Sequence, residues 1–265
     1  MRSKAVLARA VLLSVTAPIA VLWVVAAQVC ADDGRKRERG GTVELIRSPH
    51  PHVVLERERV TIDLYPRQAT VRCEFHFRNT GPGQRVLMGF PDIGGGESYR
   101  GLQGFTSWVD GRRARTRFRR EDSSGDGRGG GWHTKKVSFA AGQRRTVRNT
   151  YRQRYEILAW REVRRKIAPR TFRVDSDVWK RGFAYVLGTG ATWKGAIGTV
   201  EIVVRPHVAP NGRVAEASVA PVGSGSRKTS LLPRRRAGGL EWRLRDFEPG
   251  RDTRVWIVLR EVERV

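Results

Sequence analysis

Hydrophobic and polar residues alternate along much of this chain with a period of two. The alternation runs through residues 60–65, stops at a turn over 66–68, and resumes through residues 69–78. Because successive side chains of a strand point to opposite faces, this pattern predicts two strands joined as a hairpin. Residues 86–90 form a further predicted strand, which Pro91 ends.

A second predicted hairpin is centred on the Asp110-Gly111 pair. Residues 105–109 alternate before this pair and residues 112–118 after it, and Asp-Gly favours the backbone of a two-residue hairpin turn. After a glycine-rich loop at 123–131, further strands are predicted at 132–139 and 146–155. Turns at this spacing are typical of an antiparallel β-sandwich, which we assign to residues 42–156.

Residues 157–182 are less regular than the rest. Residues 157–167 are predicted to form a short helix that ends before Pro169, and we interpret 157–182 as a connection. Residues 221–239, rich in Ser, Gly, Arg and Pro, are predicted to be a mobile loop. Five more strands are predicted beyond the connection, at 183–187, 198–204, 214–219, 240–247 and 253–262.

These elements predict an all-β fold. We expect an antiparallel β-sandwich in two lobes, an N-terminal lobe at 42–156 and a C-terminal lobe at 183–265, joined by an irregular or short helical segment.

The N-terminus has the pattern of an export signal. Arg2, Lys4 and Arg9 precede an apolar run at 10–25, and residues 29–31 end in small side chains suited to cleavage before Asp32. We therefore predict a signal peptide at 1–31, a disordered basic leader at 32–41, and a periplasmic, secreted or cell-surface location. The alternative is a retained membrane anchor, because residues 10–29 have about the 20-residue length of a membrane-spanning helix.

The charge of the chain is strongly positive. The 51 Lys and Arg residues exceed the 26 Asp and Glu residues and give a formal net charge of +25. This excess predicts salt-dependent adhesion to anionic surfaces. Nucleic acid is the weaker interpretation, because only eight of the basic residues are Lys, and an excess of Arg is typical of a GC-rich genome. Extracellular DNA stays a third alternative.

Arginines after the second hairpin are the main candidate binding residues. Alternate positions place Arg113, Arg115, Arg117 and Arg119 on one face of the predicted strand. Trp132 and Trp179 are the tryptophans that we expect to be exposed, since one adjoins a glycine-rich loop and the other lies between charged residues. Exposed Trp near Arg suits sugars or cation stacking.

Catalytic motifs are weak in this sequence. There is no nucleophile elbow or zinc signature, and the Gly and Lys residues of 188–195 do not follow a phosphate-loop or dinucleotide pattern. No cofactor or nucleotide is therefore predicted. The least implausible pair of carboxylates is Asp92 with Glu97, which would suit an envelope hydrolase acting on glycosides or peptidoglycan.

A calcium loop is a further alternative. Asp122, Ser124 and Asp126 reproduce the first half of such a loop, with a glycine next to the last of them. The position of the bidentate Glu is occupied by His133, so no metal is predicted and the three residues stay a weak alternative.

Four short motifs resemble those of a family of exported bacterial β proteins that has no assigned activity. They are FRNTG at 77–81, VLMGFP at 86–91, YVLGTG at 185–190 and WKGAIG at 193–198. The resemblance spans most of the chain after the leader, and it implies an exported protein of the same fold class. It assigns no functional residue.

The function expected from the sequence is non-catalytic binding in the cell envelope. The expected partner is an anionic cell-surface polymer or another envelope protein, with membrane contact only through a retained N-terminal anchor. The envelope hydrolase that uses Asp92 and Glu97 is the alternative.

Overall fold

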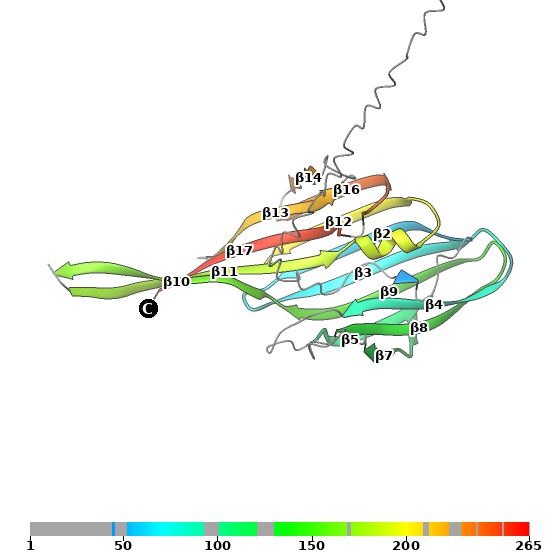
Figure 1. Cartoon of the computed structure of the whole chain (residues 1–265), viewed down its shortest axis with the longest axis horizontal. Coiled ribbons are helices and arrows are strands. Elements are labelled where there is room, and N and C mark those ends of the chain that lie inside the picture. The colour runs from blue at the N-terminus through cyan, green and yellow to red at the C-terminus, as the bar shows by residue number, and fades with distance from the viewer. Residues whose placement is uncertain are drawn as a thin grey trace, which may run out of the picture. The chain divides into compact units, whose positions relative to one another are not determined.

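The computed structural model describes residues 44–45, 52–92, 101–120, 130–168, 171–208, 212–222, 229–236, 238–250 and 252–264. Residues Arg37–Val265 form one compact unit. The described residues are almost entirely β-strands (Figure 1), with a short 3-10 turn at η1 (Gly188–Thr192). The predicted all-β fold is confirmed. None of these residues belongs to a helix long and apolar enough to cross a bilayer.

The large sheet has eight strands in the order β15-β16-β12-β2-β3-β9-β5-β6. Its N-terminal strands are β2 (Val53–Leu64), β3 (Gln68–Asn79), β5 (Gln103–Val109), β6 (Arg112–Ala114) and β9 (Arg144–Arg154). Its C-terminal strands are β12 (Ile197–Pro206), β15 (Arg234–Arg236) and β16 (Gly239–Phe247). All neighbours in this sheet are antiparallel except β2 and β12, which are parallel.

Two smaller antiparallel sheets complete the fold. The four-stranded sheet has the order β1-β4-β8-β7, with β1 (Glu44–Leu45), β4 (Gln84–Asp92), β7 (Arg117–Arg120) and β8 (Gly131–Phe139). The five-stranded sheet has the order β10-β11-β17-β13-β14, with β10 (Glu156–Ala168), β11 (Thr171–Val186), β13 (Gly212–Val222), β14 (Thr229–Leu231) and β17 (Arg254–Arg264).

The core lies between the large sheet and the two smaller ones. Phe90 of β4 packs on Tyr151 of β9 with ring centroids 5.4 Å apart. The Tyr185 hydroxyl of β11 donates a hydrogen bond of 2.8 Å to Glu58 of β2. Both smaller sheets therefore contact the same face of the large sheet. Alternate residues of β2 and β3 point into this core and are fully buried, as period-two alternation requires.

The structure corrects the interpretation of residues 157–182. The predicted helix at 157–167 is wrong, because these residues lie in β10, which pairs with β11 as a long hairpin. Strands of both predicted lobes share the large sheet, so the two halves of the chain have a common core instead of separate ones.

Several sequence predictions fall partly or wholly outside the described residues. The signal peptide at 1–31 and the basic leader at 32–41 lie outside them. The stretch predicted as a mobile loop, 221–239, contains the strands β14 and β15, while its residues 223–228 are not described.

Candidate binding site

A hollow lies where the chain passes from the large sheet to the four-stranded sheet. Asp110 and Gly111 have φ angles of 49° and 78°, which is the left-handed backbone of a tight two-residue hairpin turn. The turn folds β6 back onto β5. After three residues β6 ends, and the chain crosses to β7, which pairs with β8 in the other sheet.

The hollow has a volume of ≈ 420 Å³ and a mixed lining. Arg113 and Arg115 are its two charged lining residues, and Phe105 is its aromatic lining residue, whose ring stacks on His133 with centroids 4.2 Å apart. The remaining lining residues are small, and most carry hydroxyl groups: Thr106, Ser107, Ala114 and Thr116. Cationic and hydroxyl donors around one hollow are suited to an anionic group.

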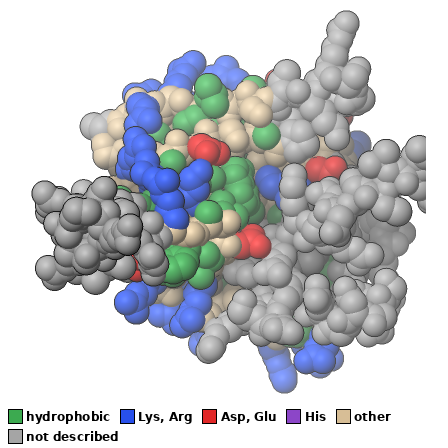
Figure 2. Space-filling model, turned by 60° about the vertical axis from the view of Figure 1, so that its left-hand side comes forward, with side chains coloured by type: hydrophobic (Ala, Val, Ile, Leu, Met, Phe, Trp, Pro, Cys, Tyr) green, Lys and Arg blue, Asp and Glu red, His purple; other side chains and the backbone are tan. Residues whose placement is uncertain are grey.

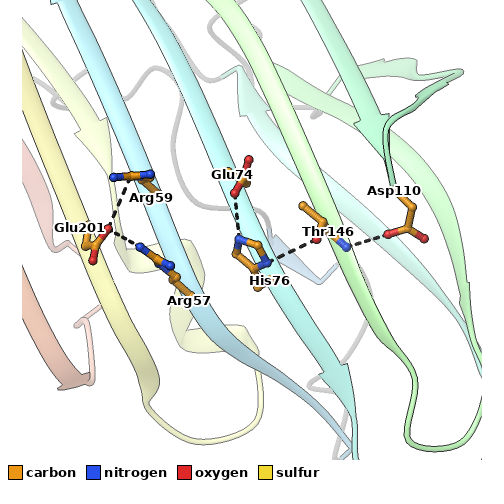
Figure 3. Close-up of polar contacts among 7 residues, drawn as sticks. All are labelled: Arg57, Arg59, Glu74, His76, Asp110, Thr146 and Glu201. Carbon is orange, nitrogen blue, oxygen red and sulfur yellow. Dashed lines mark hydrogen bonds and ion pairs between the residues drawn. The ribbon is translucent and has the colours of Figure 1, made fainter.

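Several arginines elsewhere on the large sheet form ion pairs with acids. Glu201 lies between Arg57 at 2.7 Å and Arg59 at 3.5 Å (Figure 3), and the hydrogen bond from Arg57 lowers the pKa of Glu201. The Glu56 carboxylate forms ion pairs with Arg78 and Arg144 in the same way. On the neighbouring strands, Glu74, His76, Thr146 and Asp110 also form a line of hydrogen bonds (Figure 3).

The arginines after the Asp110-Gly111 turn are different. Arg113, Arg115, Arg117 and Arg119 are exposed, and none of them forms an ion pair with an acid in the part of the chain that the structure describes. Four nearby cations without an opposite charge create a positive local potential. An anion bound in this region would be stabilised by these uncompensated charges.

Behind the hollow, a row of polar residues continues across the core face of the large sheet. Ser107 lies directly opposite Asn149 of β9, and Asn149 lies opposite Cys73 of β3. Tyr151 follows on the same face of β9. The Ser107 Oγ, both amide atoms of Asn149 and the Tyr151 Oη are buried without a hydrogen-bond partner among the described residues. Ser107 therefore connects the hollow to a row of buried polar atoms whose hydrogen bonds are not satisfied by the described residues.

The acidic groups of this row are held in their protonated forms. Burial raises the pKa of the Cys73 thiol, and the neighbouring Glu58 raises it further. Burial also raises the pKa values of Tyr151 and Tyr185 well above the ordinary value. Because a nucleophilic cysteine needs a thiolate, we assign Cys73 a structural role.

The structure brings together only some of the predicted binding residues. Arg113 and Arg115 line the hollow, whereas Arg117 and Arg119 lie on β7 in the other sheet. The prediction that all four share one strand face is therefore wrong, because the chain changes sheets after Ala114.

The two predicted tryptophans lie apart from the hollow lining. Trp132 is half-buried on β8, with Arg119 and Pro91 as its cross-strand neighbours. Trp179 is half-buried on β11, where the Arg181 guanidinium lies over its ring at 5.4 Å.

The alternative catalytic pair has only one described member. Asp92 is buried at the end of β4, where its oxygens accept the Leu102 backbone N–H at 3.0 and 3.2 Å. His133 Nε2 lies 3.0 Å from the same carboxylate. These contacts fix the chain where it returns to the core. Glu97 and the calcium candidates Asp122, Ser124 and Asp126 lie outside the described residues.

Sequence reasoning missed a buried lysine. Lys135 of β8 is buried, its Nζ has no hydrogen-bond partner among the described residues, and burial lowers its pKa from 10.5 to about 7. The signal was present in the sequence, since alternation through Val137 and Phe139 places Lys135 on the core face of this strand.

Two of the four short sequence motifs, the first and the fourth, contact each other in the structure. Phe77 of the first motif packs on Trp193 of the fourth, with ring centroids 4.4 Å apart. Lys194 Nζ donates to the Thr80 hydroxyl at 3.4 Å, and the Lys194 backbone N–H donates to the Val53 carbonyl at 3.0 Å. The described contacts of these motif residues are structural.

Comparison with known proteins establishes the fold. No family model matches the chain, and no curated protein matches it in sequence. A solved structure from Legionella pneumophila, named "putative nutrient binding protein", matches with a TM-score of 0.53 and 16% identity, over 83% of this chain and 70% of that one.

Two other solved structures match less well. An M1 zinc metallopeptidase from Deinococcus radiodurans has a TM-score of 0.33 and 9% identity, over 80% of this chain and 43% of its own. Yeast LTA4 hydrolase in complex with bestatin has a TM-score of 0.37 and 6% identity, over 78% of this chain and 28% of its own. The similarity to the Legionella protein, with its TM-score of 0.53, shows a shared β-sandwich fold.

Proposed function

We propose that this chain is an exported, non-catalytic binding module of the cell envelope, and that its hollow takes an acidic group of an anionic envelope polymer. The observation that carries the proposal is the pair Arg113 and Arg115, which line one hollow without an acidic partner among the described residues. The acidic group would be a phosphate or a carboxylate, because a guanidinium group can donate two parallel hydrogen bonds to either.

The rest of the hollow suits a polymer segment. The Thr116 hydroxyl can donate to a further oxygen, and Phe105 offers an apolar wall to a sugar or glycerol unit. The net charge of +25 would attract the polyanion over a longer range. The fold shared with a protein whose name states nutrient binding fits a binding role.

A pair of matched variants tests the proposal. The variant R113Q/R115Q removes two charges from the hollow, and R57Q/R59Q removes two charges that Glu201 already neutralises. Binding to immobilised polyglycerol phosphate and to polygalacturonate would be measured at low salt, with dextran as the neutral control. Loss of two charge-assisted hydrogen bonds should weaken binding about tenfold or more in R113Q/R115Q, and by much less in R57Q/R59Q.

Two outcomes would contradict the proposal. Equal losses in both variants would show that net charge alone attracts the polymer and that the hollow has no special role. Failure of the unmodified protein to bind either polyanion at low salt would exclude this class of partner. A preference for one polymer would identify the acidic group as a phosphate or as a carboxylate.

A further inference from the structure

Exposed hydrophobic side chains gather at the base of the β10–β11 hairpin. Ile157, Leu158 and Trp160 have exposed fractions of 63%, 40% and 49%. Figure 2, which brings forward the side where the hairpin lies in Figure 1, shows hydrophobic side chains at the surface among groups of Lys and Arg. Large exposed apolar side chains so close together indicate a contact surface.

The hairpin leaves its sheet as it extends. β17 pairs with β11 from Ser176 to Val186, so among the described residues the strands beyond Ser176 pair only with each other. Figure 1 shows this hairpin reaching past the neighbouring strands. The side chains of Ile157 and Trp160 at its base are exposed, whereas Phe183 and Tyr185 further along β11 are buried in the core.

Apolar side chains lie on both faces of this hairpin. Trp160 is directly opposite Trp179, with ring centroids 5.9 Å apart, and Ile157 is opposite Arg181, which places these residues on the face of Phe183 and Tyr185. A register shift between Ile157 and Ala159 turns Leu158 to the other face. A Cβ at Gly182 would lie 3.1 Å from the Leu158 side chain and 2.9 Å from Trp256.

This two-sided arrangement favours a fluid partner over a protein groove. A protein that docks on one face would leave the apolar residue of the other face in water. The interfacial region of a bilayer surrounds an inserted hairpin on all sides, and tryptophan is enriched at that depth because its ring is both apolar and a hydrogen-bond donor.

The charge of the hairpin selects an anionic lipid surface. Between Arg154 and Gly182 the sequence has eight Lys and Arg residues and four Asp and Glu residues. Arg161 and Lys180 are exposed beside the apolar cluster. Basic residues next to an apolar insertion are attracted by anionic headgroups, while their aliphatic stems can lie along the apolar surface.

The same features disfavour pairing with a second copy through β10. Two basic hairpins would repel each other. The β10–β11 ladder also has register shifts near Ile157, Val163 and Lys166, and such irregularities are a common protection of edge strands against pairing with another chain.

We propose that the β10–β11 hairpin binds anionic membrane surfaces by inserting Ile157, Leu158 and Trp160 into the interfacial region. The expected partner is a bilayer rich in phosphatidylglycerol or cardiolipin. This contact is separate from the hollow, and it differs from the expectation that a retained N-terminal anchor would make the only membrane contact.

Sedimentation with vesicles tests this inference. The full protein should bind vesicles of phosphatidylglycerol and phosphatidylcholine and bind pure phosphatidylcholine at least tenfold more weakly. The triple variant I157S/L158S/W160S should lose at least tenfold in affinity for the anionic vesicles. L232S is the matched control, because Leu232 is also exposed, at 76%, and lies outside the hairpin; it should bind like the unmodified protein.

A second measurement tests whether Trp160 itself lies at the membrane. It also keeps the inference testable if the triple variant does not fold. Brominated lipids should quench the tryptophan fluorescence of the bound protein, and W160F should bind equally well but lose part of the quenching. Equal vesicle binding by the folded triple variant, or unchanged quenching in W160F, would overturn the inference. So would self-association through the hairpin without vesicle binding. Since R113Q/R115Q should still bind vesicles, the inference can fail or succeed independently of the polymer site.

Discussion

Asn79 shows how one buried side chain can organise a turn. Its Nδ2 donates to the carbonyls of Gly81, Pro82 and Ala140 at 3.1, 2.7 and 3.0 Å. Its Oδ1 accepts the Gly81 N–H at 3.2 Å and the Gln84 side chain at 2.7 Å. The turn after β3 therefore depends on this amide, which explains the Asn of the first motif in physical terms.

Replacing Asn79 by Ala should destabilise the protein. The change leaves several polar groups without their partner, and we expect the free energy of unfolding to fall by about 2–4 kcal/mol. Urea unfolding followed by circular dichroism would measure this. T80A is the control, because Thr80 is exposed and, among the described residues, its side chain forms hydrogen bonds only with the His52 carbonyl and with Lys194. The free energy of unfolding of T80A should fall by less than about 1 kcal/mol. Equal losses in both variants would contradict the role given to Asn79.

At the residue scale, the sequence indicated which arginines could bind a ligand better than it indicated which other residues would lie beside them. The arginines after Asp110-Gly111 stand out because a recognisable turn precedes them, and Arg113 and Arg115 do line a hollow. Phe105 and Ser107 complete it, but only the folding of β6 onto β5 brings them there. Lys135 escaped notice because lysine is rarely buried, although its position in the alternation was informative.

Among the elements, β10 was mistaken for a helix because its bulges disturb the alternation. Each register shift moves the following residues by one position. As a result Ile157, Trp160 and Val163 are spaced by three residues, which imitates the period of a helix. The passage from β6 to β7 was missed for a different reason. No Gly or Pro marks it, and only pairing with β5 and β8 separates the two strands.

Gly131 permits the close approach of β7 to β8. A Cβ at this position would lie 2.2 Å from the Arg119 carbonyl oxygen, a backbone atom that cannot move without shifting the strand. G131A should therefore push β7 away and lower the free energy of unfolding by about 1–3 kcal/mol. G83A is the control, because the nearest atom to its Cβ would be 3.5 Å away. Hydrogen exchange of the β7 amides would locate the change, and unaltered protection there would refute it.

Across the whole molecule, buried titratable groups make stability depend on pH. Burial lowers the pKa of Lys135 to about 7, so between pH 7 and the unfolded value of 10.5 the unfolded chain binds the proton and the native chain does not. Stability from this group is therefore present at high pH and is lost as the pH falls toward 7. Cys73, Tyr151 and Tyr185 have raised pKa values, so the stability they contribute is lost as the pH rises through their unfolded values.

We expect the free energy of unfolding to rise from pH 7 to about 8.5 and to fall above about 10.5. Each group changes stability by about 1.4 kcal/mol per pH unit inside its window. Urea unfolding between pH 7 and pH 11 would measure the profile. K135M should flatten the rise, and Y185F should reduce the fall. A rise of the same slope in K135M would show that another group is responsible.

The arrangement of the sheets was the least predictable feature. The hairpins are local, and the pairs β2–β3 and β5–β6 agree with the sequence patterns. The position of β12 beside β2 depends on contacts between distant segments, which alternation cannot register. For this reason the C-terminal strands were assigned to a lobe of their own.

The parallel pairing of β2 with β12 also determines when the large sheet can be completed during synthesis of the chain. Residues that pair between β2 and β12, such as Arg57 and Thr199, are 142 residues apart, a large sequence separation of the kind that slows folding. Until β12 arrives, β2 presents an open backbone edge that other chains could join. A partly synthesised chain therefore has an unpaired edge that favours aggregation until β12 has been made.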